Sequence, residues 1–312
     1  MKKLLFISGL AVAVLASCSK TETAEPQQKE IAFSVAADKA TKAPLEGTTF
    51  ADGQKIYVSA YNSVSGKYFE GVEFSKGTDT WKAGKYWPVN GVTSFLAYAA
   101  TDAVTATWGD NYADKVSFDL ADGFFKADAT AATPYTDLLY ANGEQKAEKD
   151  YSTIPMTFKH AGAWVLFNVK LNADLNGATV NLDKFQLANI FKGGKFTVDN
   201  TSYTLKADWD FTAGTAADYD VESFTAKALS STDYTFGAII PEQAQTSIKF
   251  QYTLSGQGFD DQTVPYEHFL NRFEKWEMGK KYVYNINISL NEIEIEPSVS
   301  NWDAKTGVGI EI

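Results

Sequence analysis

The sequence contains few of the residue types that carry out chemistry in proteins. Among its 312 residues there is one cysteine, Cys18, and there are two histidines, His160 and His268. A single cysteine excludes an intrachain disulfide and a zinc site built from several thiolates. A catalytic triad needs a histidine with converging partners, and the chain has neither a Gly-x-Ser-x-Gly nor a His-Glu-x-x-His motif. We therefore expect no catalytic residue, no metal site and no cofactor, and a protein that is not an enzyme.

Basic residues are also scarce relative to acidic ones. The chain carries 28 lysines and arginines against 39 aspartates and glutamates, which gives a formal net charge of −11. A nucleic-acid binder needs a basic surface to contact phosphates, so we expect no nucleic acid as a partner. Arg272 is the one arginine, and every other basic residue is a lysine. The composition is nevertheless that of a folded chain, because 45% of the residues are hydrophobic and 14% are aromatic.

The apolar run near the N-terminus is short. It covers residues 4–15, follows Lys2 and Lys3, and has fewer than the roughly 20 residues that span a bilayer as a helix. This pattern is typical of a secretory signal. The run ends at residues 15–18, Leu-Ala-Ser-Cys, which resemble the cleavage and acylation motif of bacterial lipoproteins. An ordinary cleavage site beside a chance cysteine is the alternative.

The lipoprotein resemblance implies a signal peptide at residues 1–17 and acyl chains such as palmitate on Cys18. Acyl chains hold a protein on a membrane without a spanning helix. Ser19 differs from the aspartate that retains lipoproteins at the inner membrane, which favours a surface-exposed protein on the cell outer membrane. Residues 18–30 are polar and are predicted to form a flexible tether.

Beyond the tether, apolar and polar residues alternate along many short segments. A period of two is typical of half-buried β-strands, so we expect an all-β chain of antiparallel sandwiches. One short helical turn is expected at residues 265–276. The alternating apolar positions include Ile31, Phe33 and Val35; Ile56, Val58 and Ala60; Ile248, Phe250, Tyr252 and Leu254; and Tyr282, Tyr284, Ile286, Ile288 and Leu290.

Turns and a domain boundary are predicted from the polar residues between these segments. Gly, Asn, Asp and Ser are typical of turns and loops. They occur at 66–67, 79–80, 90–91, 142–143, 193–194 and 256–258, and residues 193–194 are predicted to form a hairpin turn. A charged stretch at 141–151 divides the remaining chain into comparable halves. We expect one domain at residues 31–150 and a second at residues 151–312.

Several motifs, in a shared order, resemble the fimbrillin (type V pilin) family of surface lipoproteins from anaerobic bacteria. The resemblance implies two transthyretin-like antiparallel β-sandwich domains in tandem. It also implies a structural subunit of fimbriae with a role in adhesion, whose partners are other fimbrial subunits. The motifs are Tyr-Trp-Pro-Val-Asn-Gly at 86–91, Phe-Leu-Ala-Tyr at 95–98, Thr-Asp-Leu-Leu-Tyr-Ala at 136–141, Met-Thr-Phe-Lys-His-Ala at 156–161, Ile-Ile-Pro-Glu-Gln at 239–243, Trp-Glu-Met-Gly-Lys-Lys-Tyr-Val-Tyr at 276–284 and Val-Ser-Asn-Trp at 299–302.

The resemblance also implies how such a subunit polymerises. In the family, a protease removes the first strand after a basic residue, and the vacated groove accepts an extended C-terminal segment of the next subunit. In this chain the removed strand would be residues 31–35. The donor would be about residues 299–312, with Val308, Ile310 and Ile312 filling the groove. Backbone bonds would give affinity, and alternate side chains would set the register.

The chain departs from the family at the maturation site. Stalk subunits are usually cut after arginine, but no arginine precedes Arg272, and the loop after the first strand offers only Lys39 and Lys42. Either a protease that accepts lysine cuts there, or the strand is retained. In the second case the subunit would be a tip or an anchor of the fibre.

Aromatic residues suggest another function, a monomeric outer-membrane lipoprotein that binds a host ligand or a glycan. Sugar rings stack on exposed aromatic side chains, but aromatic residues in strands mostly fill cores. Trp87, Trp276 and Trp302 lie in the family-like motifs and are predicted to be structural. The candidate sugar platforms are Trp81, Trp108 and Trp209.

The remaining polar candidates have structural explanations as well. His160 is expected to be a buried or sheet-end imidazole with a hydrogen bond, and His268 is also expected to be structural. Asp208, Asp210, Asp218 and Asp220 lie close together in the sequence and could bind calcium, although their spacing lacks the glycine and glutamate of an EF-hand. The alternative is a solvated loop.

Overall fold

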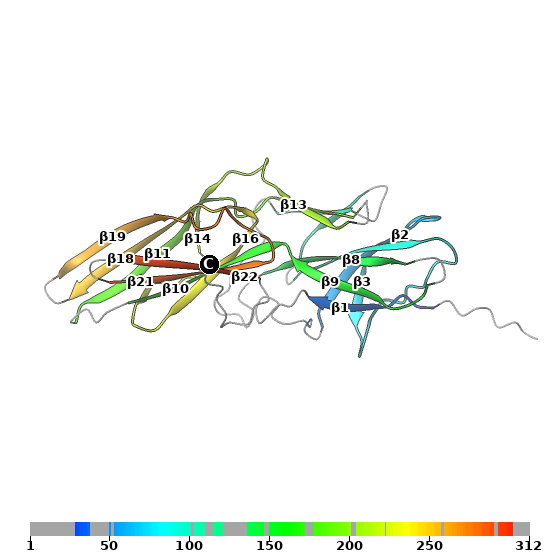
Figure 1. Cartoon of the computed structure of the whole chain (residues 1–312), viewed down its shortest axis with the longest axis horizontal. Coiled ribbons are helices and arrows are strands. Elements are labelled where there is room, and N and C mark those ends of the chain that lie inside the picture. Colours follow the sequence, from blue (N-terminus) through cyan, green and yellow to red (C-terminus); the bar gives the residue numbers. More distant parts are fainter. Residues whose placement is uncertain are drawn as a thin grey trace, which may run out of the picture.

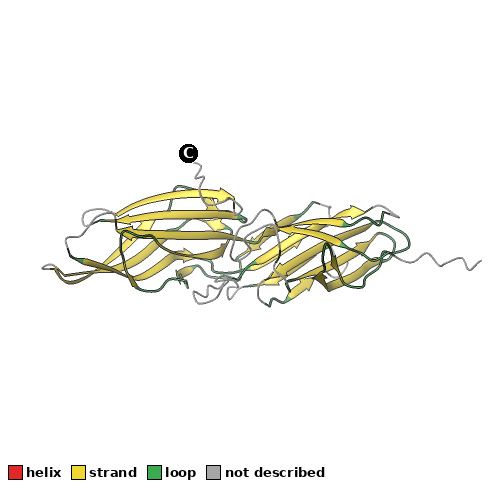
Figure 2. Ribbon diagram, turned by 90° about the horizontal axis from the view of Figure 1, so that it is seen from below, coloured by secondary structure: helices red, strands yellow, loops and turns green. Residues whose placement is uncertain are grey.

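A computed structural model describes residues 29–37, 50, 53–100, 103–109, 115–120, 136–146, 150–171, 177–200, 204–221, 223–256, 259–289 and 293–301. All regular structure in these ranges is β-strand, which confirms the predicted all-β class. The helical turn predicted at residues 265–276 was wrong, because this segment completes strand β19 (Phe259–Phe269) and contains β20 (Lys275–Trp276). The molecule is elongated, with one lobe formed mainly by the N-terminal half and one by the C-terminal half (Figures 1 and 2).

The N-terminal lobe is a closed barrel with the strand order β1-β4-β3-β2-β5-β8-β9. It is therefore not an open antiparallel sandwich, since β1 pairs with both β4 and β9 and runs parallel to β9. Apolar side chains from alternate positions of these strands fill the interior. The strands are β1 (Phe33–Ala37), β2 (Lys55–Asn62), β3 (Gly66–Lys76), β4 (Trp81–Lys82), β5 (Thr93–Ala100), β8 (Leu138–Lys146) and β9 (Ile154–His160).

The C-terminal lobe has a sandwich arrangement. One sheet has the order β16-β10-β21-β22, and the other has the order β14-β11-β18-β19, with β15 also paired to β11. Side chains from both sheets form one core, in which Phe167, Phe185 and Phe236 contact one another. The strands are β10 (Gly162–Leu171), β11 (Thr179–Ile190), β14 (Ala217–Asp220), β15 (Lys227–Ala228), β16 (Tyr234–Pro241), β18 (Ser247–Gly256), β21 (Lys280–Ile288) and β22 (Ile293–Asn301).

A further sheet is built from both halves of the chain. Strands β6 (Ala106–Trp108) and β7 (Lys115–Asp119) come from the first half, and β12 (Lys195–Asp199) and β13 (Lys206–Asp210) come from the second. In the order β13-β12-β7-β6, β12 pairs with β7 over its whole length. This interlobe sheet covers a core to which strands of both lobes contribute. A separate pair joins β17 (Gln243–Ala244) to β20.

Residues 79–80 and 90–91 lie between strands as predicted, but residues 66–67 are the first two residues of β3, and two further predictions differ from the structure. Residues 142–143 lie inside β8, where an added Cβ at Gly143 would come within 2.9 Å of the Ile154 side chain. Residues 193–194 connect β11 to β12, which belong to different sheets, so they do not form a hairpin turn. A Cβ at Gly194 would lie 2.7 Å from the Asp210 carbonyl oxygen. Both glycines therefore allow close packing between segments.

The lobes meet near the middle of the chain. The barrel core takes its last residue, Phe158, from β9, and the sandwich core takes its first, Ala163, from β10. The two strands are separated only by Ala161, which is buried in the interlobe core. The proposed division into domains at residue 150 remains a prediction, because strands of both halves share the interlobe sheet.

Candidate assembly site

The most unusual element of the barrel is its first strand. β1 runs parallel to β9 from Phe33 opposite Ile154 to Ala37 opposite Phe158, and it meets β4 at one pair, Phe33 and Trp81. Parallel neighbours require a long connection, and here most of the lobe's chain separates β1 from β9. Figure 1 shows β1 along the side of the barrel, next to β9.

The residues before β1 are held in place too. The backbone N–H of Ile31 donates to the Lys85 carbonyl at 2.7 Å, and that of Trp87 donates to the Lys29 carbonyl at 3.0 Å. On the other side, the N–H of Ile154 donates to the Ala32 carbonyl at 3.0 Å. The whole segment 29–37 therefore fills a slot between β9 and residues 81–87.

Side chains of this segment enter the barrel core. Ile31 and Phe33 have no exposed surface. The Phe33 ring lies edge-on to Phe74 and Phe95, with centroid distances of 4.9 and 5.3 Å. Full burial of such a side chain contributes about 1.5–3 kcal/mol. A replacement strand would therefore need apolar side chains at alternate positions to restore the core.

The predicted first strand, residues 31–35, agrees with this segment except at its ends. The hydrogen-bonded strand spans Phe33–Ala37, but Ile31 already lies in the core. After β1 the next described residue is Phe50, which is buried edge-on to Trp81 and Phe158. The proposed cleavage positions Lys39 and Lys42 lie outside the described residues, so they remain predictions.

The chain end that would supply the donor follows β22. This strand forms one side of its sheet and pairs with β21 over nine positions, from Ile293 opposite Ile288 to Asn301 opposite Lys280. The first three residues of the proposed donor, 299–301, are therefore paired within their own chain. The proposed groove-filling residues Val308, Ile310 and Ile312, like Cys18 at the other end, lie outside the described residues.

His160 is structural, as predicted. It is the last residue of β9, and its Nδ1 lies 2.7 Å from Oδ2 of Asp137, which directly precedes β8. The exposed fractions of the two side chains are 2% and 0%. Burial keeps both away from any dissolved substrate. His268 also packs against a neighbour, with its ring parallel to that of Tyr266.

The tryptophans proposed as sugar platforms are not exposed rings. Trp81 is buried in the barrel core. Trp108 and Trp209 are half-buried against the interlobe core, and Nε1 of Trp209 donates to the Ala161 carbonyl at 2.8 Å. The predicted structural roles of Trp87 and Trp276 are confirmed by their burial, whereas Trp302 lies outside the described residues.

The four clustered aspartates belong to different sheets. Asp208 and Asp210 lie on β13, while Asp218 and Asp220 lie on β14 and contact lysines. Within the described ranges, no three histidine, cysteine or acidic side chains are placed to hold a metal ion. The prediction of a solvated loop was only partly correct, since these residues are on solvent-exposed strands.

Three features of the structure were not predicted from the sequence. They are the contact of residues 85–87 with the first segment, the pairing of β7 with β12, and the partner of His160. Each joins residues far apart in the chain. Two of them had a signal, because residues 85–87 overlap the family-like Tyr-Trp-Pro motif and Asp137 and His160 both lie in family-like motifs.

Comparison with known proteins agrees with the fold. The family model described as fimbrillin-like matches residues 41–302. No curated protein matches the sequence. In the part of the chain that the structure describes, no helix has the length and hydropathy that crossing a membrane requires.

Solved structures from Bacteroides have the same fold. A proposed cell adhesion protein of Bacteroides uniformis has 18% identity and a TM-score of 0.53, over 89% of this chain and 100% of its own. A fimbrial protein of Bacteroides vulgatus has 14% identity and a TM-score of 0.52, over 81% of this chain and 93% of its own. A proposed cell adhesion protein of Bacteroides ovatus has 16% identity and a TM-score of 0.51, over 89% of this chain and 99% of its own.

Proposed function

The chain belongs to the fimbrillin-like family, and on that premise we propose that it is a structural subunit of cell-surface fimbriae that assembles by strand exchange and takes part in adhesion. It would be anchored in the cell outer membrane through lipid on Cys18, at least until it joins the fibre. Its partners would be other fimbrial subunits, of the same or of a different kind.

The parallel strand β1 is the observation that supports this proposal most directly. A sheet edge with unpaired N–H and C=O groups binds another strand readily. Loss of residues 29–37 would leave β9 and the short β4 as two such edges, with an empty apolar slot lined by Phe74 and Phe95 between them. The C-terminal alternation of Val308, Ile310 and Ile312 has the period of two that such a slot requires.

Whether β1 is removed decides the role of the subunit in the fibre. We propose that cleavage after Lys39 or Lys42 opens the slot and makes the protein a polymerising stalk subunit. If the strand is retained, the slot stays closed and the subunit can only end a fibre. N-terminal sequencing and intact mass of the protein from the cell surface distinguish a start at acylated Cys18 from a start after either lysine.

A peptide experiment tests strand exchange itself. The full-length chain, cut by a lysine-specific protease in the 38–49 segment, is incubated with a synthetic peptide of residues 299–312. We expect the peptide to replace β1, which is released and detected by mass spectrometry. A peptide with Val308→Asn, Ile310→Asn and Ile312→Asn is the matched control. If both peptides displace β1 equally, or neither does, the donor assignment is wrong.

Deletion of residues 307–312 tests the same assignment in the intact chain. The truncated subunit should fold, because the described strands end before this segment, but it should not donate to a neighbour. Heat-resistant ladders on denaturing gels should form with the full chain and not with the truncated one. Ladders from the truncated protein would contradict the proposal.

A further inference from the structure

The outer face of the β14-β11-β18-β19 sheet carries a shallow groove with several polar side chains in its lining. Phe185 and Phe250 pack into the lobe core, so alternation points their neighbours Lys184, Gln186, Lys249 and Gln251 toward solvent. These four side chains line the groove, which has a volume of about 430 Å³. Small-molecule sites in proteins have volumes of roughly 300–1,000 Å³. The groove is therefore large enough for a ligand.

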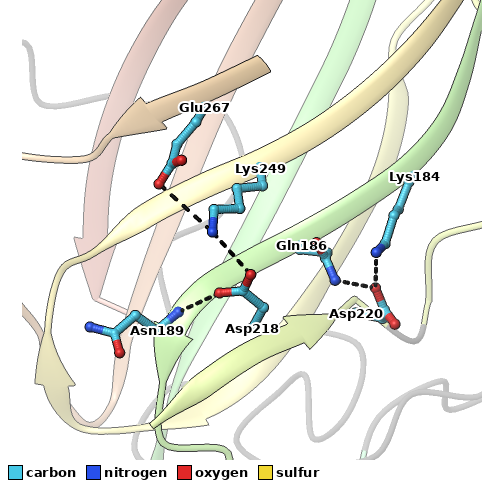
Figure 3. A network of polar contacts seen from close by, with 7 residues as sticks. All are labelled: Lys184, Gln186, Asn189, Asp218, Asp220, Lys249 and Glu267. Atoms are coloured by element: carbon cyan, nitrogen blue, oxygen red, sulfur yellow. Dashed lines mark hydrogen bonds and ion pairs between the residues drawn. The ribbon is translucent and has the colours of Figure 1, made fainter. Parts of the chain in front are cut away.

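Polar side chains in and beside the groove form two separate groups, each held together by hydrogen bonds and ion pairs (Figure 3). Lys249 donates to Asp218 Oδ2 at 3.0 Å and lies 4.0 Å from a carboxylate oxygen of Glu267 on β19. The other oxygen of Asp218 accepts from the backbone N–H of Asn189 at 3.1 Å. In the second group, Gln186 Nε2 donates to Asp220 Oδ1 at 2.8 Å, and Lys184 Nζ lies 3.8 Å from the same atom.

Folding stability does not explain this arrangement. The side chains of the Lys249–Asp218 pair are 37% and 40% exposed, and ion pairs with such exposure contribute little to stability. The contacts do fix positions and charge states. The hydrogen bond from Lys249 lowers the pKa of Asp218, and the hydrogen bond to Asp218 raises the pKa of Lys249, so both stay charged near neutral pH.

The charges of the groove nearly cancel. Each of the two lysines already lies against a carboxylate, so no free ammonium group is left to select an anion. Protein interfaces are depleted of lysine and glutamate, which this groove presents at Lys184, Lys249 and Glu267, while its aromatic lining residues Phe250 and Tyr266 pack against the lobe core. A neutral ligand with many hydrogen-bonding groups fits these residues better than an anion or a protein.

Gln251 and Pro265 complete the site. They lie opposite each other on β18 and β19, and both line the groove. The Gln251 amide has no side-chain hydrogen bond to the rest of the described chain, so its donors and its acceptor are open to a ligand. The Pro265 ring offers an apolar surface beside it. A sugar has this combination, with hydroxyl groups at its rim and C–H groups on its faces.

We propose that the groove formed by Lys184, Gln186, Lys249, Gln251, Pro265 and Glu267 binds a short uncharged oligosaccharide. The site lies on the lobe opposite to β1, so it is independent of strand exchange. We propose it, in place of the tryptophans, as the site where this protein would contact a glycan, through amide and carboxylate groups.

Binding of the full-length protein to an array of neutral, sialylated and sulfated oligosaccharides tests the proposal. We expect retention on neutral glycans. Gln251→Ala and Glu267→Gln should each weaken that retention about tenfold, the loss expected when one hydrogen bond to a ligand is removed. Glu73→Gln is the matched control, since Glu73 forms a similar exposed pair with Lys55 on the barrel.

Three results would overturn the proposal. They are retention of acidic glycans only, retention that both groove variants leave unchanged, and no retention of any glycan by the wild-type protein. Thermal unfolding of each variant checks that it folds, and exposed strand substitutions of this kind usually change stability little. Ladder formation by the same variants should be unchanged, which separates this result from the strand-exchange tests.

Discussion

Phe118 of β7 lies directly opposite Phe196 of β12, with ring centroids 6.3 Å apart and ring planes within 26° of parallel. The first residue comes from the N-terminal half and the second from the C-terminal half, and neither ring is exposed. Tyr98 and Tyr140 of the barrel pack edge-on against them at 5.0 and 5.5 Å. The two lobes therefore share a core, and we expect them to behave as one stiff unit along the length of the molecule.

Replacement of Phe196 should destabilise both lobes together. Phe196→Ala removes a fully buried ring from the interlobe core and should cost about 3–5 kcal/mol. Calorimetry should show one unfolding transition for the wild-type protein and one, at a lower temperature, for the variant. Val64→Ala is a control at a 72% exposed position and should leave the transition in place. If Phe196→Ala gives two separate transitions, one of them unchanged, then the lobes are independent.

Replacement of Phe33 should loosen the first strand. Phe33→Ala leaves a cavity between Phe74 and Phe95 and should reduce the free energy that keeps β1 in the barrel by about 3–5 kcal/mol. Hydrogen exchange should then be faster at the amides of Ile31 and Ile154, which donate to the carbonyls of Lys85 and Ala32. Ser34→Ala, at the exposed neighbouring position, is the matched control. Equal exchange rates in the two variants would argue against Phe33 as the main anchor.

Buried tyrosines predict a loss of stability at alkaline pH. Burial raises the pKa of Tyr140 to about 12 and that of Tyr98 to about 12, from an unfolded value of 10.0. Below pH 10.0 both states keep the phenol protonated, and the stabilisation is fully present. It is lost as the pH rises toward 12, because the unfolded chain ionises first. Unfolding free energies across this range should fall with pH, and less steeply for Tyr140→Phe. An unchanged slope in that variant would contradict the assignment.

Removal of Cys18 tests the lipid anchor. Cys18→Ala should abolish acylation, so cells fed a labelled fatty acid should show no label on the protein, and the uncleaved precursor should accumulate. The wild-type protein should be labelled and should fractionate with the outer membrane. Normal labelling of the variant would mean that the lipid is attached elsewhere or that the lipoprotein motif has been misread.

The sequence alone determined the class of structure and which faces of its strands are buried. Tyr282, Tyr284, Ile286 and Ile288 alternate in the sequence and are all buried on β21, because a strand turns successive side chains to opposite sides. The burial of His160 could likewise be predicted from the apolar residues near it in the sequence. Local spacing carries this information, so no knowledge of distant partners was required.

Only the tertiary structure decided which strands are neighbours. The pairing of β1 with β9, and of β7 with β12, joins segments whose local patterns say nothing about each other. The same limit explains the wrong turn at residues 142–143 and the wrong hairpin at residues 193–194, where glycine allows close packing against a distant segment. It also explains Trp81, which looked exposed beside a loop but packs against Phe50. The groove of the C-terminal lobe could not be predicted either, because its lining residues meet only when β11, β18 and β19 lie side by side.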